Sequence, residues 1–289
     1  MLLIGGLVRV EAQAPPSIAE GRRLLDLGQP EQAIALLESA RASWTEASEQ
    51  GEAVRVLGLA YMLAGRAAEA VPHLQAALAA NASPDVAHVL AQAAVQTRQP
   101  DTVRLALAVA FGLPSTAAEV QVAAGQLMAR MDMHEMADVE LRGALTRAPT
   151  VLQANYLLGQ QALFRGRLDE AIDLTRRELA LNPLDSMALT QLGDALGRQA
   201  RWDEAAPVLQ RSIWLNPYYS APYILLARGY LATSQADLAE GMAQRALSFD
   251  PNNRSAHYLH GQILQRLGRA DAAKAAFARA EALQDQGRR

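Results

Sequence analysis

Small and apolar residues recur along this chain with a period of 34 residues. When each repeat is numbered from 1 to 34, position 8 is glycine or alanine, position 20 is alanine in all repeats but one, and positions 24 and 27 are mostly leucine and alanine. Positions 20, 24 and 27 share one face of a helix, while position 8 lies on an earlier helix. The pattern predicts pairs of antiparallel helices, because small residues let the two helices of a pair lie close together.

Turn signals follow the same period. Pro149, Pro183, Pro217 and Pro251 are 34 residues apart, and each marks a helix end because a proline disfavours helical conformation in the residue before it. Turns such as Ala64-Gly65-Arg66 separate the two helices of a repeat, and acidic residues begin the second helix, where they complement its dipole. The chain therefore divides into eight repeats, at about residues 14–50, 51–83, 84–117, 118–151, 152–185, 186–219, 220–253 and 254–287.

Several repeats carry a recognisable signature. The second and sixth repeats show it at positions 7, 8, 20 and 24, in the residues Leu57, Gly58, Ala70, Leu74, Leu192, Gly193, Ala205 and Leu209. This arrangement, with proline at position 32, resembles the tetratricopeptide repeat. The resemblance implies an all-α solenoid, a right-handed superhelix of antiparallel helix pairs, that forms a single domain over residues 17–287.

Some positions depart from the family pattern. Glu178 and Ser212 replace the alanine of position 27 in the fifth and sixth repeats, so we expect different helix contacts there. Pro72 and Pro207 both occupy position 22. We place them in the first turn of the second helix, where a proline costs little because the first amides of a helix have no partner within it.

Residues 1–16 precede the repeats and allow two interpretations. Met1 to Val8 are apolar, and Ala12-Gln13-Ala14 resembles the small-x-small pattern before a signal-peptidase site. A cleaved signal peptide would mean export to a bacterial periplasm, whereas an uncleaved leader would leave the protein in the cytoplasm. No other stretch approaches the roughly 20 consecutive apolar residues of a membrane span, so we expect none in the body of the chain.

Composition narrows the function classes. A formal net charge of −3 gives no driving force for releasing counterions from a nucleic acid, so nucleic acid is not an expected partner. The absence of cysteine excludes disulfides, thiolate catalysis and cysteine-based metal sites. Lys274, the only lysine, does not lie in a phosphate-binding loop. The composition rich in arginine and alanine favours a bacterial source.

Two histidine arrangements suggest metal binding but favour other roles. His134-Glu135 lacks the second histidine of the zinc-protease helix motif. His257 and His260 are three residues apart, but His260 occupies position 7, where the repeat buries an apolar residue, so we interpret it as a packed structural histidine. Because the repeats occupy nearly the whole chain, we predict no catalytic, cofactor or metal site and expect a non-enzyme.

The family resemblance implies a concave groove that is lined by positions 2, 5, 9, 12 and 13 of the first helices. Position 9 forms a mostly glutamine ladder, and glutamine can both donate to and accept from the backbone of an extended peptide. Aromatic residues at position 5 would anchor the same ligand, although a solvated face is the alternative interpretation. The predicted groove residues are Gln92, Gln126, Gln160, Asp194, Arg228, Gln262, His88, Tyr156 and Tyr258.

An aromatic cluster lies at the junction of the sixth and seventh repeats. It consists of Trp214, Tyr218, Tyr219 and Tyr223, and we interpret it either as packing between repeats or as an exposed anchor for a partner. No lysine occurs at position 5 of any repeat, so the carboxylate clamp of chaperone-binding relatives is not expected.

These features predict a non-catalytic scaffold that binds an extended peptide or a partner protein in its groove, in a bacterial assembly or envelope process. Two alternatives stay open. One is a structural solenoid that self-associates into a homo-oligomer. The other is an accessory or regulatory subunit of an enzyme such as a glycosyltransferase or an envelope protease. An RNA-binding helical repeat is a weaker alternative, because such repeats are basic and 35 residues long.

Overall fold

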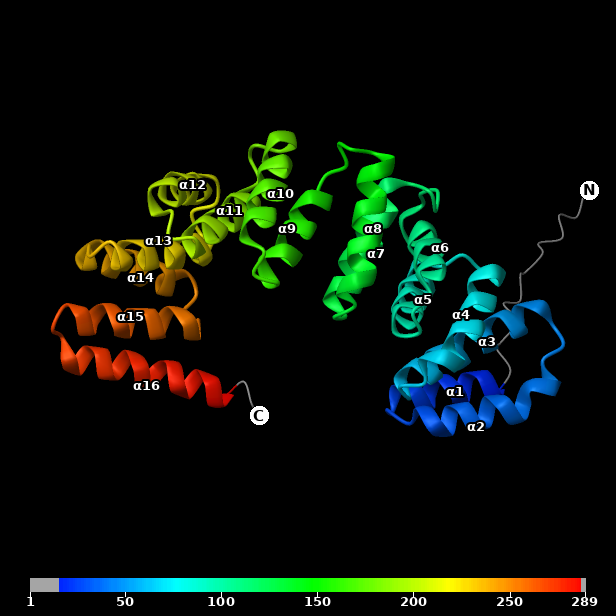
Figure 1. The fold of residues 1–289 in the computed structure, drawn as a ribbon. Coiled ribbons are helices and arrows are strands. Elements are labelled where there is room, and N and C mark those ends of the chain that lie inside the picture. Colours follow the sequence, from blue (N-terminus) through cyan, green and yellow to red (C-terminus); the bar gives the residue numbers. More distant parts are fainter. Residues whose placement is uncertain (1–15, 287–289) are drawn as a thin grey trace, which may run out of the picture. The chain divides into compact units, whose positions relative to one another are not determined.

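The structure is a computed structural model that describes residues 16–286. Within this range the chain forms helices and no β-strand, which confirms the predicted all-α solenoid of helix pairs (Figure 1). A short 3₁₀ helix, η1 (Arg41–Ser43), follows the second α-helix. The α-helices are α1 (Pro16–Asp26), α2 (Pro30–Ala40), α3 (Ala47–Leu63), α4 (Ala67–Ala80), α5 (Pro84–Gln96), α6 (Pro100–Phe111), α7 (Ala118–Arg130), α8 (His134–Arg147), α9 (Ala154–Phe164), α10 (Leu168–Leu181), α11 (Ser186–Arg198), α12 (Trp202–Leu215), α13 (Ser220–Ala232), α14 (Ala236–Phe249), α15 (Arg254–Arg266) and α16 (Ala270–Gln286).

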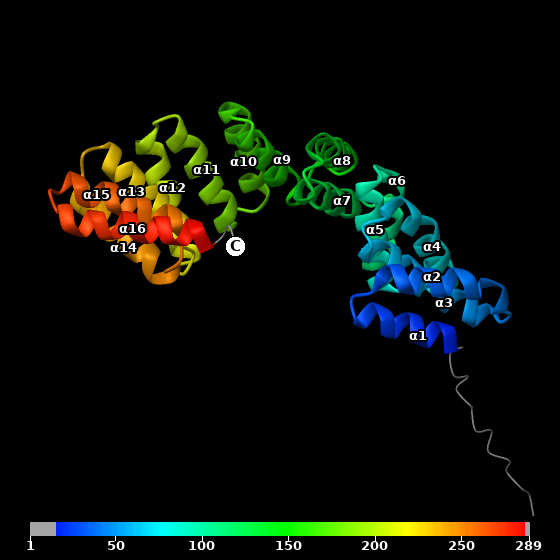
Figure 2. The ribbon, with the colours of Figure 1, turned by 90° about the horizontal axis from the view of Figure 1, so that it is seen from below.

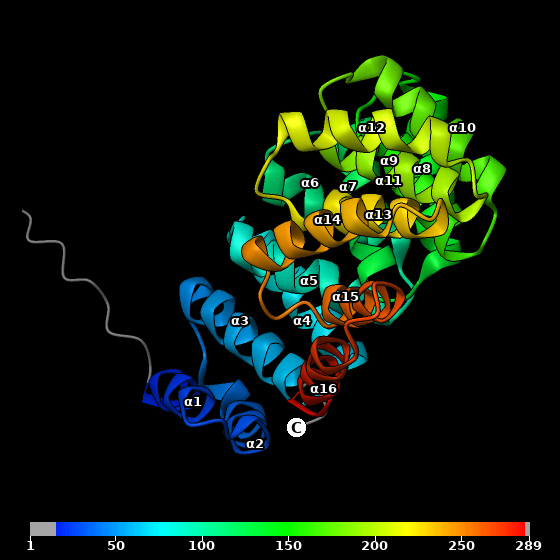
Figure 3. The same ribbon diagram turned by 90° about the vertical axis from the view of Figure 1, so that its left-hand side faces the viewer.

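The helices follow one another in pairs whose members pack together, as α3 does with α4 and α13 with α14. The chain divides into two compact units, with the boundary between Ala144 and Leu145. In the first unit α1 contacts α3, and α3 contacts α5 (Figure 2). In the second unit α13 contacts both α11 and α15 (Figure 3). Within each unit, this stacking brings the first helices of successive repeats side by side.

Glycine at position 8 lets the two helices of a pair pack closely. A Cβ atom at Gly58 would lie 2.7 Å from Cγ of Leu74, and one at Gly125 would lie 2.6 Å from Cγ of Leu141. Each leucine occupies position 24 of the repeat that contains its glycine, so a larger residue at position 8 would collide with the partner helix. The close approach that the small residues predicted is therefore confirmed.

The turn between the two helices of each pair passes through a left-handed residue. This residue is always at position 15, and its φ lies between 56° and 75°. Residues with a Cβ atom adopt this conformation at a cost of about 1 to 2 kcal/mol, whereas glycine adopts it without that steric cost. The turns therefore share one backbone geometry but differ in strain. The eight residues are Gly28, Gly65, Arg98, Asp132, Gly166, Ala200, Ser234 and Gly268.

Pro72 and Pro207 lie deeper in their helices than predicted. Helix α4 begins at Ala67 and α12 begins at Trp202, so each proline is the sixth residue of its helix. A proline there provides no N–H to the carbonyl four residues earlier, which belongs to residue 68 in α4 and to residue 203 in α12. The expectation that both prolines fall in the first helical turn is therefore wrong.

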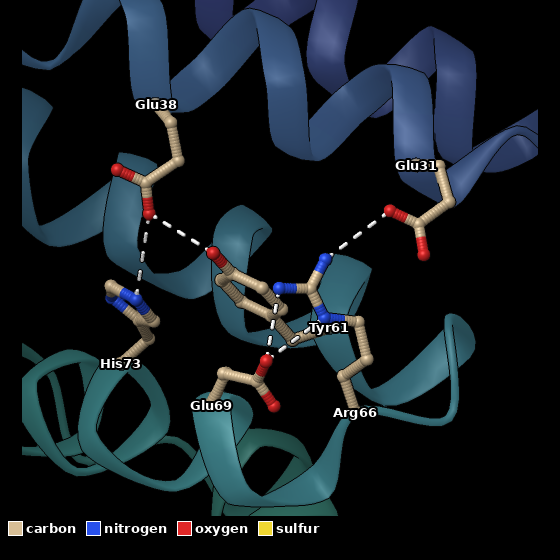
Figure 4. A network of polar contacts seen from close by, with 6 residues as sticks. All are labelled: Glu31, Glu38, Tyr61, Arg66, Glu69 and His73. Atoms are coloured by element: carbon tan, nitrogen blue, oxygen red, sulfur yellow. Dashed lines mark hydrogen bonds and ion pairs between the residues drawn. The ribbon is translucent and has the colours of Figure 1, made fainter.

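A polar network joins the first two helix pairs (Figure 4). The ring of Tyr61 on α3 stacks on His73 of α4, with the ring centroids 5.4 Å apart, and its hydroxyl donates to Oε1 of Glu38 on α2 at 3.2 Å. The guanidinium of Arg66 lies 4.7 Å from the centre of the Tyr61 ring and pairs with Glu31 of α2. These contacts fix the stacking of the second repeat on the first.

Two buried polar residues replace the alanine of position 27 in the second unit. Glu178 and Ser212 are both 0% exposed. The Glu178 carboxylate accepts from the backbone N–H groups of Gln153 at 2.6 Å and Tyr156 at 3.2 Å. The Ser212 hydroxyl lies 2.8 Å from the carbonyl oxygen of Ser186. Both side chains therefore reach the N-terminal turn of the first helix in their own repeat, which an alanine cannot do.

No helix between residues 16 and 286 combines the length and the apolar character that a membrane crossing requires.

Candidate functional site

The first helices of three successive repeats surround a hollow of about 600 Å³ in the first unit, between α1, α3 and α5. We call it the first-unit groove. Its lining comes mainly from positions 9, 12 and 13, which are among those that the family resemblance turns toward a concave face. The lining residues are Arg22, Leu25, Asp26, Arg55, Val56, Leu59, Met62, Leu63, Val89 and Gln92.

The floor of the first-unit groove is apolar. Val56 is buried, Leu25, Leu59 and Met62 are half-buried, and Leu63 is 65% exposed. Removing apolar surface from water is favourable, and ligand sites in proteins are typically concave and lined by apolar side chains. The groove is therefore suited to apolar side chains of a bound segment.

The rim of the first-unit groove carries both charges. Arg22 and Arg55 both pair with Glu52, and Arg55 Nη2 lies 2.6 Å from Glu52 Oε1. Burial disfavours ionisation of Glu52, but the hydrogen bonds from Arg55 and Arg22 outweigh it, so the pKa of Glu52 lies below its ordinary value. Asp26 and Gln92 also line the hollow and add further polar groups.

A second hollow of about 670 Å³ is formed by α3, α4 and the segment that follows α4. It shares Arg55 with the first-unit groove, and its lining is small or polar, with Ser48, Gly51 and Asn81 among the residues. One face of α3 therefore runs from a polar hollow to an apolar one, with Arg55 between them. An extended chain that follows this face would contact both.

The four glutamines of the predicted ladder are exposed. Gln92 on α5 lines the first-unit groove, and Gln126 on α7 belongs to the same unit. Gln160 on α9 and Gln262 on α15 belong to the second unit. Their amides are available to a partner, and Gln92 is the one that lines the first-unit groove.

The two charged members of the ladder interact with each other. Asp194 on α11 lies 3.9 Å from Arg228 on α13, and it forms a shorter ion pair of 2.9 Å with Arg198. Asp194 is half-buried, while Arg228 is exposed. The carboxylate is therefore already paired, and a ligand there would compete with two arginines.

The predicted aromatic residues at position 5 have protein neighbours. The ring centroids of His88 and Phe111 are 6.5 Å apart in an edge-on arrangement, and those of Tyr258 and Phe277 are 5.4 Å apart. Tyr156 is half-buried, and burial raises the pKa of its hydroxyl. Tyr258 remains 54% exposed, so it combines a packed ring with an accessible surface.

The aromatic cluster of the sixth and seventh repeats divides into two kinds of residue. Tyr223 is buried, and its hydroxyl donates to the carbonyl of Pro217 at 2.9 Å. Tyr219 is half-buried. Trp214 and Tyr218 are 79% and 77% exposed. Packing between repeats therefore accounts for Tyr223, while Trp214 and Tyr218 present accessible aromatic surface and their role as an anchor stays a prediction.

His257 and His134 have local partners, whereas the buried Nε2 of His260 has no hydrogen-bond partner within residues 16–286. His257 Nε2 lies 2.9 Å from the carbonyl oxygen of Pro251, and burial lowers the pKa of His260. His134 lies 3.8 Å from Asp132. Between residues 16 and 286, His, Cys, Asp and Glu do not gather in any group of three that could hold a metal ion.

Comparisons with known proteins identify the repeat. A family model described as tetratricopeptide repeat matches residues 18–87 and 156–223, and a second model with the same description matches residues 255–286. The chain is a tetratricopeptide repeat protein. The family that the sequence resembles is thereby confirmed. No curated protein matches the chain.

Solved structures agree with the tetratricopeptide repeat fold. MamA (41-end) from Desulfovibrio magneticus RS-1 is 22% identical, with 58% of this chain and 96% of that chain covered and a TM-score of 0.52. The APC/C hetero-tetramer Cut9–Hcn1 is 16% identical, with 88% of this chain and 49% of that chain covered and a TM-score of 0.53. At these identities the likeness shows the fold alone. The family itself typically provides non-catalytic scaffolds that bind protein or peptide partners.

The sequence-based prediction missed the apolar half of the groove in this tetratricopeptide repeat protein. Position 9 is Arg22 in the first repeat and Leu59 in the second, so the glutamine ladder does not extend there. A signal was nevertheless present, because Leu59, Met62 and Leu63 are apolar at positions 9, 12 and 13 of a first helix. Apolar residues at positions that should face a groove are typical of binding surfaces.

Proposed function

We propose that this tetratricopeptide repeat protein is a non-catalytic scaffold that binds an extended segment of a partner protein in the first-unit groove. The observation that supports the proposal is the apolar hollow between α1, α3 and α5, which is lined at positions 9, 12 and 13 of successive repeats. Exposed Leu63 and half-buried Met62 provide the apolar contact, and Gln92 provides an amide for the backbone of the segment.

The expected affinity is moderate. Each leucine-sized side chain that the ligand buries in the groove contributes about 1.5 to 3 kcal/mol, and each hydrogen bond contributes about 0.5 to 1.5 kcal/mol net. Ordering the segment and losing its translational freedom offset a large part of this gain. Two apolar anchors and a few hydrogen bonds therefore suggest a dissociation constant of about 1 μM.

The polar ladder extends the proposal to other first helices. Gln126, Gln160 and Gln262 would bond the backbone of a partner, since each amide offers donors and an acceptor. Arg228 and the half-buried Asp194 would take part only if their mutual contact opened. At position 5, His88 in the first unit and Tyr156 and Tyr258 in the second would each flank a chain bound to their own unit.

The proposal is tested by affinity capture from a lysate of the source organism. Leu63→Glu places a charge in the groove at a site that is already 65% exposed, so the fold should tolerate it. Leu105→Glu is the matched control, because Leu105 is 57% exposed on α6 of the same unit and does not line the groove. We expect the wild type and Leu105→Glu to capture the same partner in similar amounts. Leu63→Glu should capture at least tenfold less of that partner. Equal capture by all three proteins would refute the groove as the binding surface.

A further inference from the structure

A smaller hollow of about 270 Å³ lies in the second unit, where the start of α12 meets α13 and the turn after it. Trp202, Asp203 and Ala206 line it from α12, and Leu226 and Tyr230 line it from α13. We call it the Trp202 pocket. Sites for whole small-molecule ligands usually measure about 300 to 1,000 Å³, so this pocket is closer to the size of one side chain.

The Trp202 ring is held in place by two glycines. A Cβ atom at Gly197 of α11 would lie 2.6 Å from the ring, and one at Gly229 of α13 would lie 2.7 Å from it. Any side chain at either site would push the indole away. Both close approaches are to atoms of the six-membered ring, so α11 and α13 hold the indole there, and the part of it that lines the pocket has a fixed position.

The pocket also contains a carboxylate without a partner. Asp203 is exposed, and within residues 16–286 its side chain forms no ion pair or hydrogen bond, whereas the adjacent Glu204 is paired with Arg201 at 2.7 Å. Pro207 has no N–H, so the backbone carbonyl of Asp203 also lacks its usual helical donor. Asp203 therefore brings an unpaired acceptor to one end of an aromatic pocket.

Charge decides which ligand suits this arrangement. The N-terminus of α12 alone would favour an anion because of the helix dipole, but the full charge of Asp203 exceeds the partial charge of the helix end. A cation is attracted both to the carboxylate and to the faces of indole and phenol rings. Trp202, Tyr230 and Asp203 together select a positively charged group with an apolar stem.

We propose that the Trp202 pocket binds a single cationic side chain, arginine or lysine, of a partner protein. The guanidinium or ammonium group is recognised by Asp203 and the two aromatic rings, and the aliphatic stem is recognised by Leu226 and Ala206. This contact goes beyond the proposed function, because it uses a different unit of the chain and a different ligand chemistry from the apolar first-unit groove.

The test uses the full chain labelled with 5-fluorotryptophan, whose three tryptophans give three ¹⁹F signals. Trp202→Phe assigns the signal of the pocket. N-acetyl-argininamide is the probe, and N-acetyl-citrullinamide is its uncharged counterpart of the same shape. We expect the argininamide to shift the Trp202 signal in a saturable way, with a dissociation constant of about 1 mM for a ligand of this size, and the citrullinamide to bind at least tenfold more weakly.

Asp203→Asn should weaken argininamide binding about tenfold. Asp237→Asn is the matched control and should leave it unchanged, because Asp237 occupies the same position of the next repeat and does not line the pocket. Equal shifts by the two amides in the wild type, which requires no variant to fold, would overturn the proposal. Tighter binding of free arginine than of the blocked amide would also overturn it, by assigning the pocket to a metabolite. Leu63→Glu should not alter this titration, so the two proposals can fail separately.

Discussion

The carboxylate of Glu178 provides a test in which the family pattern and the structure predict opposite results. Alanine is the usual residue at position 27, so Glu178→Ala restores the pattern and would be expected to stabilise the protein. In the structure, however, Glu178 on α10 accepts from the N–H groups of Gln153 and Tyr156 at 2.6 and 3.2 Å. Gln153 precedes α9 in a left-handed conformation, and no side-chain hydrogen bond of its own caps the helix. Glu178 therefore caps α9 from the neighbouring helix.

The magnitude follows from these contacts. A hydrogen bond to a charged acceptor contributes about 1.5 to 3 kcal/mol, and the 3.2 Å bond belongs at the low end of that range. The loss of both bonds is offset by the higher helix propensity of alanine, about 0.5 kcal/mol, and by the removal of a charge that is costly to bury. We expect Glu178→Ala to lower the free energy of unfolding by about 2 to 4 kcal/mol.

Urea denaturation followed by circular dichroism and by tryptophan fluorescence measures this change. Ser212→Ala is the control, because it also restores alanine at a buried position 27 but removes only hydrogen bonds between neutral groups, and Thr190 keeps its own bond to the Ser186 carbonyl at 2.8 Å. Ser212→Ala should cost about 1 kcal/mol. If Glu178→Ala is as stable as the wild type, the cross-helix cap contributes nothing and the reasoning is wrong.

Two further predictions concern the turns and the response to pH. Ala200→Gly should raise the free energy of unfolding by about 1 kcal/mol, because Ala200 has a φ of 58° and glycine relieves that strain. Gly166→Ala, at the same position of the preceding repeat, should lower the free energy of unfolding by a similar amount. A loss of stability in Ala200→Gly would contradict the argument. Burial lowers the pKa of His73, while the charge of Glu38 opposes this shift and that of Arg41 assists it. The unfolded chain therefore binds more protons than the folded chain just below pH 6.5. The contribution of His73 to stability is complete above about pH 6.5 and is lost as the pH falls toward the folded pKa. His73→Phe keeps an aromatic ring against Tyr61 and should flatten part of this decline between pH 7.5 and 5 in thermal melts, whereas an unchanged decline would exclude His73 as its source.

The sequence predicted the fold because the residues that define it are local and periodic. Gly58 and Leu74 lie in one repeat, and their sizes alone indicate that two helices approach closely. A turn was predicted in every repeat, but the residue named as its signal was glycine, and Ala200 and Ser234 adopt the same left-handed conformation. Both residues are exposed, and each turn is closed by a backbone hydrogen bond, from Arg201 to Leu196 and from Gln235 to Tyr230. Their own preference disfavours the left-handed conformation, so their residue types did not reveal it.

The candidate sites were less predictable because they depend on exposure and on contacts between repeats. Gln92 was predicted to line a groove, whereas the apolar residues around Leu59 were not, because the predicted ladder was defined by glutamine and not by the apolar residues at the same position. The sequence marked Glu178 as a departure, and only the proximity of α10 to the start of α9 gave it a role. The Trp202 pocket depends on two glycines from neighbouring first helices, which no spacing rule connects.

The contact between position 8 and position 24 has a consequence for how this protein changes length in evolution. Leu74 follows Gly58 by the same sixteen residues that separate Leu209 from Gly193, and each leucine packs on the glycine of its own repeat. A duplicated repeat that carries this glycine and leucine therefore arrives with that internal fit complete. Whole repeats can be gained or lost without redesigning that fit, whereas a single inserted residue between the two positions would destroy it. The proposed binding surfaces, which draw on two or three repeats at once, are the part that such events would rebuild.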